Sequence, residues 1–255
     1  HHVFIYCDKF EDVKIPIQSN LKSIGKSCFS MTSITSITIP KHVKKIENQA
    51  FYDCNKLKQV DFSQNTELIE IEENLFAHST VEKIILSKNI QKIHDHAFFK
   101  CMYLDEVYIP KDSELRSIGV NSFSGTQINT FLFPQYLNEL KESWCYYTPA
   151  ISNILISPKN KKYAFCDRDH KIVVGKSNKN DGSFDSIVLV SRDITRIKIP
   201  SFIKYLCTCS LSSCEELKKI EFDEDSQLVS IDAYAFSSSF FERITIPFRT
   251  NYIGK

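Results

Sequence analysis

The nine cysteines of this 255-residue chain are the residues with the widest chemistry, because thiols form disulfides, bind metals and act as nucleophiles. Nine is an odd number, so at least one thiol must be free or paired between molecules. Cys54, Cys101 and Cys214 occupy one recurring position, which other units fill with small hydroxyl residues. If the units stack as neighbouring strands, Cys54 and Cys101 lie two strands apart, about 10 Å, beyond the reach of a disulfide. This placement favours buried free thiols over a disulfide framework.

Metal-binding spacings are the next chemical signal to consider. Cys207 and Cys209 form the only close cysteine pair, and one intervening residue does not match the spacing of zinc-binding or redox pairs. The His-Asp-His segment at 94–96 offers imidazole and carboxylate ligands, but another unit places Glu-Asn-Gln at the equivalent positions 47–49, as an ordinary polar turn does. We therefore expect an exposed turn at 94–96, with no metal and no cofactor.

Nucleophilic catalysis by a triad needs a serine or cysteine brought together with a histidine and an acid. Serines here recur at turn positions throughout the chain, and the sequence has no G-x-S-x-G elbow, phosphate loop or H-E-x-x-H pair. Stacked repeats also present open surfaces rather than the closed, dry pockets that shift pKa values. The sequence therefore predicts a protein that is not an enzyme.

The overall composition excludes two classes of partner. Lys and Arg number 32 against 31 Asp and Glu, so the basic excess that nucleic acids or anionic lipid surfaces demand is missing. No run approaches the roughly 18–20 apolar residues needed to cross a bilayer. With 42% hydrophobic and 25% charged residues, the composition is that of a folded chain without nucleic-acid or membrane contact in this segment.

The element that must position every candidate residue is a short alternating apolar segment, often closed by proline. Such alternation predicts a short strand with one buried face, and a proline can end it because it removes a ladder donor. It recurs at Val13–Ile15, Ile37–Ile39, Val60–Phe62, Ile84–Leu86, Val107–Ile109, Phe131–Phe133, Ile154–Ile156, Ile197–Ile199, Ile220–Phe222 and Ile244–Ile246. Each repeat is thus expected to contribute one strand to a stack.

A second apolar pair and a large side chain follow each predicted strand. Five residues after this pair comes a large side chain, which is a phenylalanine in most repeats: Phe29, Phe51, Phe76, Phe98, Phe123 and Phe236. Cys145 and Leu211 are the exceptions. Stacked repeats would join these rings into a continuous aromatic spine, which buries what no single repeat could bury alone.

The spacing of the repeats, 23–24 residues, divides the chain into three parts of a single solenoid over residues 1–255. Residues 10–150 read as regular repeats, residues 151–193 as one elongated repeat, and residues 194–255 as regular repeats with the last incomplete. Within the elongated repeat, apolar runs at 163–166 and 171–174 predict a hairpin, and the polar loop at 176–182 is expected to be the most mobile segment.

The repeat L-x-x-I-x-I-P-x-x-V-x-x-I-G-x-x-A-F-x-x-C closely resembles the BspA-type leucine-rich repeat. The segment from Ile34 to Lys56 follows it almost position for position, and Gly25, Gly119 and Gly254 supply its glycine. The resemblance covers essentially Phe10 to Lys255. It implies a β-rich leucine-rich-repeat solenoid, with one short parallel strand per repeat on the concave face and turns with short strand or helical segments on the convex face.

The resemblance also implies a function, because such proteins are often surface or secreted molecules of mucosal bacteria and parasitic protists that adhere to host cells or matrix proteins. We therefore expect a cell-surface adhesion module that binds a host or extracellular matrix protein. The alternative is a cytoplasmic scaffold that uses the same surface, because the chain has no Asn-x-Ser/Thr sequon and its thiols are expected to be free. A signal peptide or membrane anchor in the full-length chain would decide between them.

The binding surface is expected on the outward column of the predicted strands, between the two buried positions of each. This column is polar at both ends of the array and apolar over four consecutive repeats, about 14 Å. The apolar residues are Ile85, Tyr108, Leu132 and Leu155, here called the apolar stripe, and their flanking residues are Lys83, Glu106, Thr130 and Asn153. An exposed stripe would centre a protein contact, with Tyr108 as its anchor. The alternative is that the hairpin folds over the stripe and turns it into local core.

The end of the array gives a last expectation. The final predicted strand at 244–246 is followed by no polar capping repeat. An open end exposes edge groups, so the segment is expected either to continue in a longer array or to self-associate through its uncapped ends.

Overall fold

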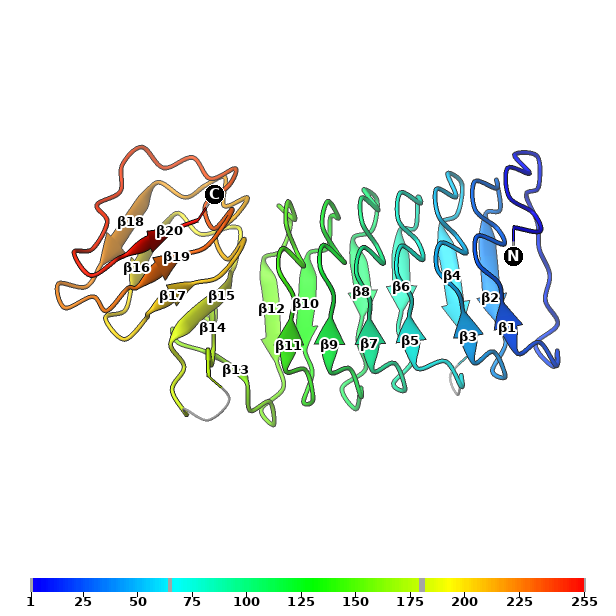
Figure 1. The fold of residues 1–255 in the computed structure, drawn as a ribbon, viewed down its shortest axis with the longest axis horizontal. Helices are drawn as coiled ribbons and strands as arrows, with labels where there is room; N and C mark the ends of the chain where they lie inside the picture. Colours follow the sequence, from blue (N-terminus) through cyan, green and yellow to red (C-terminus); the bar gives the residue numbers. More distant parts are fainter. Residues whose placement is uncertain (1, 64–65, 179–181, 255) are drawn as a thin grey trace.

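The computed structural model describes residues 2–63, 66–178 and 182–254, and its strands stack in a row from the N-terminus (Figure 1). Most repeats contribute a longer strand and a two-residue strand to opposite sheets. The longer strands are β2 (Ser36–Ile39), β4 (Gln59–Phe62), β6 (Lys83–Ile85), β8 (Glu106–Tyr108), β10 (Thr130–Phe133), β12 (Asn153–Ile156), β16 (Arg196–Ile199) and β18 (Lys219–Phe222). The two-residue strands are β1 (Ser23–Ile24), β3 (Lys45–Ile46), β5 (Glu70–Ile71), β7 (Lys92–Ile93), β9 (Ser117–Ile118), β11 (Glu139–Leu140), β17 (Tyr205–Leu206), β19 (Ser230–Ile231) and β20 (Tyr252–Ile253).

The longer strands pair in parallel, and each residue faces its equivalent in the next repeat, as the alternating apolar segments predict. They form the sheets β2-β4-β6-β8, β10-β12 and β16-β18. Ile37 faces Val60 across the first pair and Ile84 faces Val107 further along, so equivalent apolar residues lie side by side in the core. The predicted solenoid of parallel strands is confirmed. The described residues contain no helix, so short strands and turns alone make up the opposite side of each repeat.

The aromatic spine is also confirmed over five repeats. Successive rings of Phe29, Phe51, Phe76, Phe98 and Phe123 have centroids 5.1–5.5 Å apart and planes within 12° of each other. Stacking at this spacing follows from the repeat itself, because adjacent strands bring equivalent side chains to about 4.8 Å. The stack ends at Trp144, which meets Phe123 edge-on.

Each regular turn after a two-residue strand carries two residues in the left-handed region, four positions apart. His96 and Lys100 are one such pair, with φ of 58° and 56°. Between them, the Phe98 amide donates to the Ser122 carbonyl of the next repeat at 2.8 Å, and the same bond recurs along the stack. These bonds between repeats satisfy turn backbone groups that would otherwise be unpaired in the interior.

The elongated repeat contains the predicted hairpin and a further strand that the sequence did not indicate. β13 (Tyr163–Phe165) pairs antiparallel with β14 (Ile172–Gly175), and β14 pairs antiparallel with β15 (Ser186–Val190). β15 then pairs in parallel with β17, so the hairpin extends the sheet of two-residue strands. In Figure 1 the strands after β13 lie at an angle to those before it. Part of the loop predicted as mobile, residues 179–181, lies outside the described residues.

The elongated repeat lacks the left-handed turn, and the Arg192 side chain takes its place. Arg192 is 3% exposed, and its guanidinium donates to the carbonyls of Cys209 at 3.2 Å and Ser210 at 2.9 Å. The same group lies 3.8 Å from the sulfur atoms of Cys145 and Cys214, which belong to the repeats on either side. Arg192 therefore connects the turn of the preceding repeat with the turn of the following repeat, at the place where the elongated repeat has no turn of its own.

Two predicted strands are wrong, at 13–15 and 244–246. Neither segment forms a hydrogen-bonded strand in the structure. Val13 and Ile15 pack against the core only partly, while Ile246 is exposed. Each belongs to the first or last described repeat. The two-residue strands β1 and β20 of these repeats do pair with a neighbour, but the segments at 13–15 and 244–246 bury too little of their apolar side chains to form a second ladder.

All nine cysteines are free, and those in the small-residue column are buried. Cys54 Sγ donates to the Phe29 carbonyl at 3.0 Å, and Cys101 makes the same bond to Phe76. Burial raises the pKa of the Cys54 thiol from 9.0 to about 11 and that of Cys101 to about 12. Each thiol thus acts as a small core residue with a weak hydrogen bond.

We expect Cys54 and Cys101 to resist alkylation in the folded protein, because the thiolate is the reactive form and their raised pKa values keep them protonated. Exposed Cys7 should react readily at neutral pH. Mass-spectrometric mapping of iodoacetamide-labelled peptides, with and without denaturant, measures this difference. Equal labelling of Cys7 and Cys54 without denaturant would contradict it.

The same burial makes the free energy of unfolding depend on alkaline pH. Because the folded-state pKa of Cys101 lies above its ordinary value of 9.0, the unfolded chain loses this proton first as pH rises. The contribution is fully present below pH 9 and is lost as pH rises toward 12. Denaturant titrations across this range should show a smaller decline for Cys101→Ser than for the wild type.

Candidate functional site

The apolar stripe lies on the outward face of the longer strands. In β6 and β8 the burial alternates exposed, buried, exposed, because successive side chains point to opposite faces of a sheet. Ile85 is 45% exposed, Tyr108 57% and Leu155 47%. Leu132 is half-buried and packs against the core. Three of the four stripe residues are therefore about half exposed to solvent.

The polar residues that flank the stripe are paired with one another across neighbouring repeats. Lys83 faces Glu106 in register and forms an ion pair with it. Asn153 faces Thr130, and its Nδ2 donates to Thr130 Oγ1 at 3.2 Å. These pairs place a largely neutral border beside the stripe.

The stripe consists of two ladder-paired halves. Ile85 faces Tyr108 in one sheet, and Leu132 faces Leu155 in the next. β8 and β10 are neighbours in the row without a ladder between them, and the turns before them are joined by a bond from the Gln127 amide to the Leu104 carbonyl at 2.9 Å. The predicted hairpin extends the other sheet, and Ile85, Tyr108 and Leu155 are exposed rather than covered by it.

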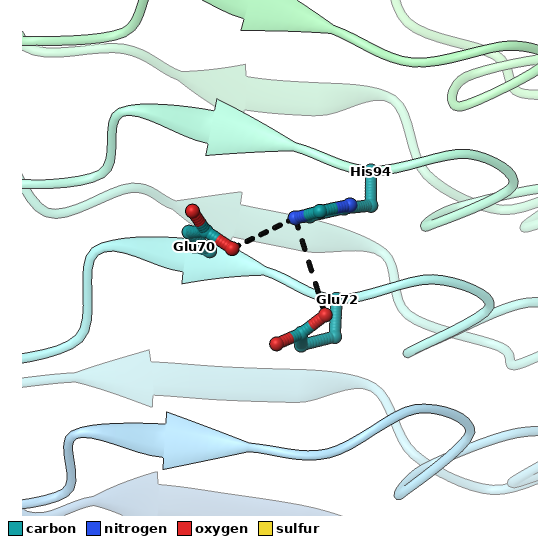
Figure 2. A group of neighbouring side chains, drawn as sticks. All are labelled: Glu70, Glu72 and His94. Carbon is teal, nitrogen blue, oxygen red and sulfur yellow. Dashed lines mark hydrogen bonds and ion pairs between the residues drawn. The ribbon is translucent and has the colours of Figure 1, made fainter.

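The turn at 94–96, set aside above as a metal site, does not bring its own three side chains together. Asp95 Oδ1 accepts from the Val120 amide at 2.8 Å, and His96 Nε2 lies 3.4 Å from Asn121 Nδ2. His94 instead turns back to the preceding repeat, where its Nε2 lies 2.8 Å from Glu70 Oε2 and 4.0 Å from Glu72 Oε2 (Figure 2).

This group of three side chains is not evident from the residues at 94–96 alone, because two of its members lie in the preceding repeat. The pairing register between adjacent repeats predicts this contact. Ile71 faces Ile93 in the ladder, so the residues that follow, Glu72 and His94, are neighbours in adjacent repeats. A search for ligands one repeat apart would have found them.

A chain of stacked parallel repeats around an aromatic spine defines the class of β-solenoid repeat proteins. A family model described as the BspA type leucine-rich repeat region matches residues 1–101, 69–172 and 183–255, with six copies. These matches cover nearly the whole chain, and the chain belongs to this family. The resemblance inferred from the repeat is therefore confirmed. No helix among the described residues is long and apolar enough to cross a membrane.

Solved structures share the fold at low sequence identity. The pneumococcal vaccine antigen PcpA is 20% identical with a TM-score of 0.81, over 92% of this chain and 64% of that one. A leucine-rich repeat protein from Bacteroides ovatus is 20% identical with a TM-score of 0.58, over 97% and 63%. A leucine-rich cell surface protein from Faecalibacterium prausnitzii is 19% identical with a TM-score of 0.57, over 92% and 83%.

These similarities show the fold alone. The chain spans less than two thirds of the length of the first two structures. No curated protein matches the chain.

Proposed function

We propose that this chain is a non-enzymatic protein-binding repeat domain and that the apolar stripe is the centre of its contact surface. The exposure of Ile85, Tyr108 and Leu155 on paired strands carries the proposal. Contiguous exposed apolar residues with a polar border are typical of protein contacts, and a tyrosine buries a large ring while keeping a hydroxyl for hydrogen bonding. The rigid ladders beneath the stripe hold these side chains in place without a large entropic penalty on binding.

The partner that we propose is a host-cell or extracellular matrix protein, bound by a surface or secreted adhesion module. Membership of the BspA-type family supports this choice, as does the cell surface protein from Faecalibacterium prausnitzii among the structures of the same fold. The second candidate is an intracellular scaffold, favoured by nine free thiols, which fit a reducing compartment. Antibody labelling of intact and permeabilised cells distinguishes the two, because an adhesion module is labelled on intact cells.

Replacing Ile85 by serine together with Tyr108 by alanine should weaken partner binding at least tenfold, since central anchors typically contribute about 1.4 kcal/mol or more. Because both side chains are exposed, thermal stability should change little. Binding is measured by surface plasmon resonance against immobilised fibronectin, laminin and collagen, and against whole host cells.

The matched control is Thr38→Ala with Asp61→Ala, which face each other in the same outward column but outside the stripe. The control should bind like the wild type. Equal binding by the stripe variant and the wild type would remove the stripe as the contact surface, and an equal loss in both variants would point to a different face.

A further inference from the structure

Glu70, Glu72 and His94 converge from two adjacent repeats onto one place. Glu70 lies in β5 and Glu72 follows it on the same face, while His94 follows β7. The ladder pairs Ile71 with Ile93, and the His94 amide donates to the Ile71 carbonyl at 2.9 Å. The backbone of two paired strands therefore holds all three side chains, and in Figure 2 both carboxylates point toward the imidazole.

The carboxylates of this cluster have a histidine as their direct side-chain partner, although Lys92 stands opposite Glu70 in the ladder. Elsewhere along the array carboxylates meet lysines, as in the pairs Lys58 with Glu82 and Lys44 with Glu67. Among the described residues, Glu70 and Glu72 form no ion pair with a lysine or arginine, and His94 is their one partner of opposite sign. Both carboxylates lie beside the same imidazole, and the Glu72 side chain is only 18% exposed. Bringing like charges together at a partly buried site is unfavourable unless a cation lies between them.

The following repeat places no side chain next to His94 at the equivalent position. Gly119 occupies the equivalent position there, and a Cβ added to it would lie 2.5 Å from the His94 carbonyl carbon. A surface hollow of about 230 Å³ on this side is lined by His94 together with residues that include Glu73, Lys92, Gly119 and Lys141. The ring therefore has room for the small rotation that ligation requires.

We propose that Glu70, Glu72 and His94 bind one divalent transition-metal ion of the zinc class. One imidazole nitrogen and two carboxylate oxygens, all within 4.8 Å of one another, match the mixed ligands of such ions. Tetrahedral ligation at about 2.0–2.2 Å places ligand atoms about 3.4 Å apart. The ion would therefore replace the 2.8 Å contact between His94 and Glu70, with Glu72 moving closer to His94 from 4.0 Å and water completing the tetrahedron. Mg²⁺ and Ca²⁺, which prefer oxygen ligands, should bind more weakly. The ion would cross-link two repeats and stabilise the middle of the array.

Cobalt(II) is the direct probe, because its spectrum distinguishes nitrogen and oxygen ligands from the thiolates of the nine cysteines. Titration of the wild type should produce visible d–d absorption without the near-ultraviolet thiolate charge-transfer band, with one ion bound per chain. Zn²⁺ should displace the cobalt and raise the melting temperature, as expected for a ligand that binds only the folded state. Mg²⁺ at the same concentration should do neither.

His94→Gln should abolish this absorption, and Glu72→Gln should weaken cobalt binding at least tenfold. His96→Gln, which changes the neighbouring histidine outside the cluster, is the matched control and should bind like the wild type. Equal binding by wild type and Glu72→Gln, or absorption dominated by the thiolate band, would overturn the proposal. Circular dichroism verifies the fold of each variant, and Glu70→Gln, at a half-buried position, replaces any variant that does not fold.

Discussion

Replacing Arg192 by methionine should lower the free energy of unfolding by about 2–4 kcal/mol. Methionine keeps an unbranched apolar stem but cannot donate to the carbonyls of Cys209 and Ser210. Each carbonyl would then keep one donor, the Ser212 hydroxyl or the Val190 amide. Hydrogen bonds from a charged donor each contribute about 1.5–3 kcal/mol. Part of this loss is offset, because the variant no longer has to bury the guanidinium charge. The net loss of stability should be confined to the region where the elongated repeat joins the regular repeats before and after it.

Denaturant titration measures the total effect, and hydrogen exchange locates it. Amides of the turn at 209–214 should exchange faster in Arg192→Met, while those around Phe51 should keep their protection, because repeats couple mainly to their neighbours. Arg196→Met, on the exposed side of β16, is the control and should change stability by less than about 0.5 kcal/mol. An Arg192→Met protein as stable as the wild type would show that packing alone joins these turns.

Phe98→Ala should have the larger effect, a loss of about 3–5 kcal/mol, because it opens a cavity in the middle of the aromatic spine. Phe98 is fully buried and stacks on Phe76 and Phe123, with centroids 5.4 Å and 5.1 Å away. Removing it deprives two neighbouring rings of their contacts at once. In a solenoid such a defect separates the array into two weakly coupled halves.

Phe99→Ala is the matched control, since Phe99 is the adjacent residue but points away from the spine toward His78 and His96. Because Phe99 is only half-buried, this variant should lose about 1 kcal/mol, of the order that an aromatic pair contributes. Thermal unfolding of Phe98→Ala should broaden or divide into two transitions, while Phe99→Ala keeps the shape of the wild-type curve. Similar losses in the two variants would mean that the spine does not carry the stability of the array.

The sequence by itself determined the repeating architecture and the side chains of its core. Alternating apolar residues place Ile37 and Val60 in register, and the recurring phenylalanines build the spine, because one local pattern is repeated and each copy packs against the next. The outward position of Ile85 and Tyr108 followed from the same alternation. The hairpin was also predictable, since its two apolar runs and polar turn are local signals.

Only the tertiary structure decided what happens where the repetition breaks and where neighbouring repeats meet. β15 and the role of Arg192 depend on how an irregular segment fills the space left by a missing turn, which no repeat average describes. The terminal segments at 13–15 and 244–246 have strand-like sequences, but their apolar side chains stay partly or largely exposed and the segments form no ladder. The contact of His94 with Glu70 and Glu72 joins residues 24 and 22 positions apart in the sequence. It exists because, in a parallel stack, residues about one repeat apart lie on adjacent strands.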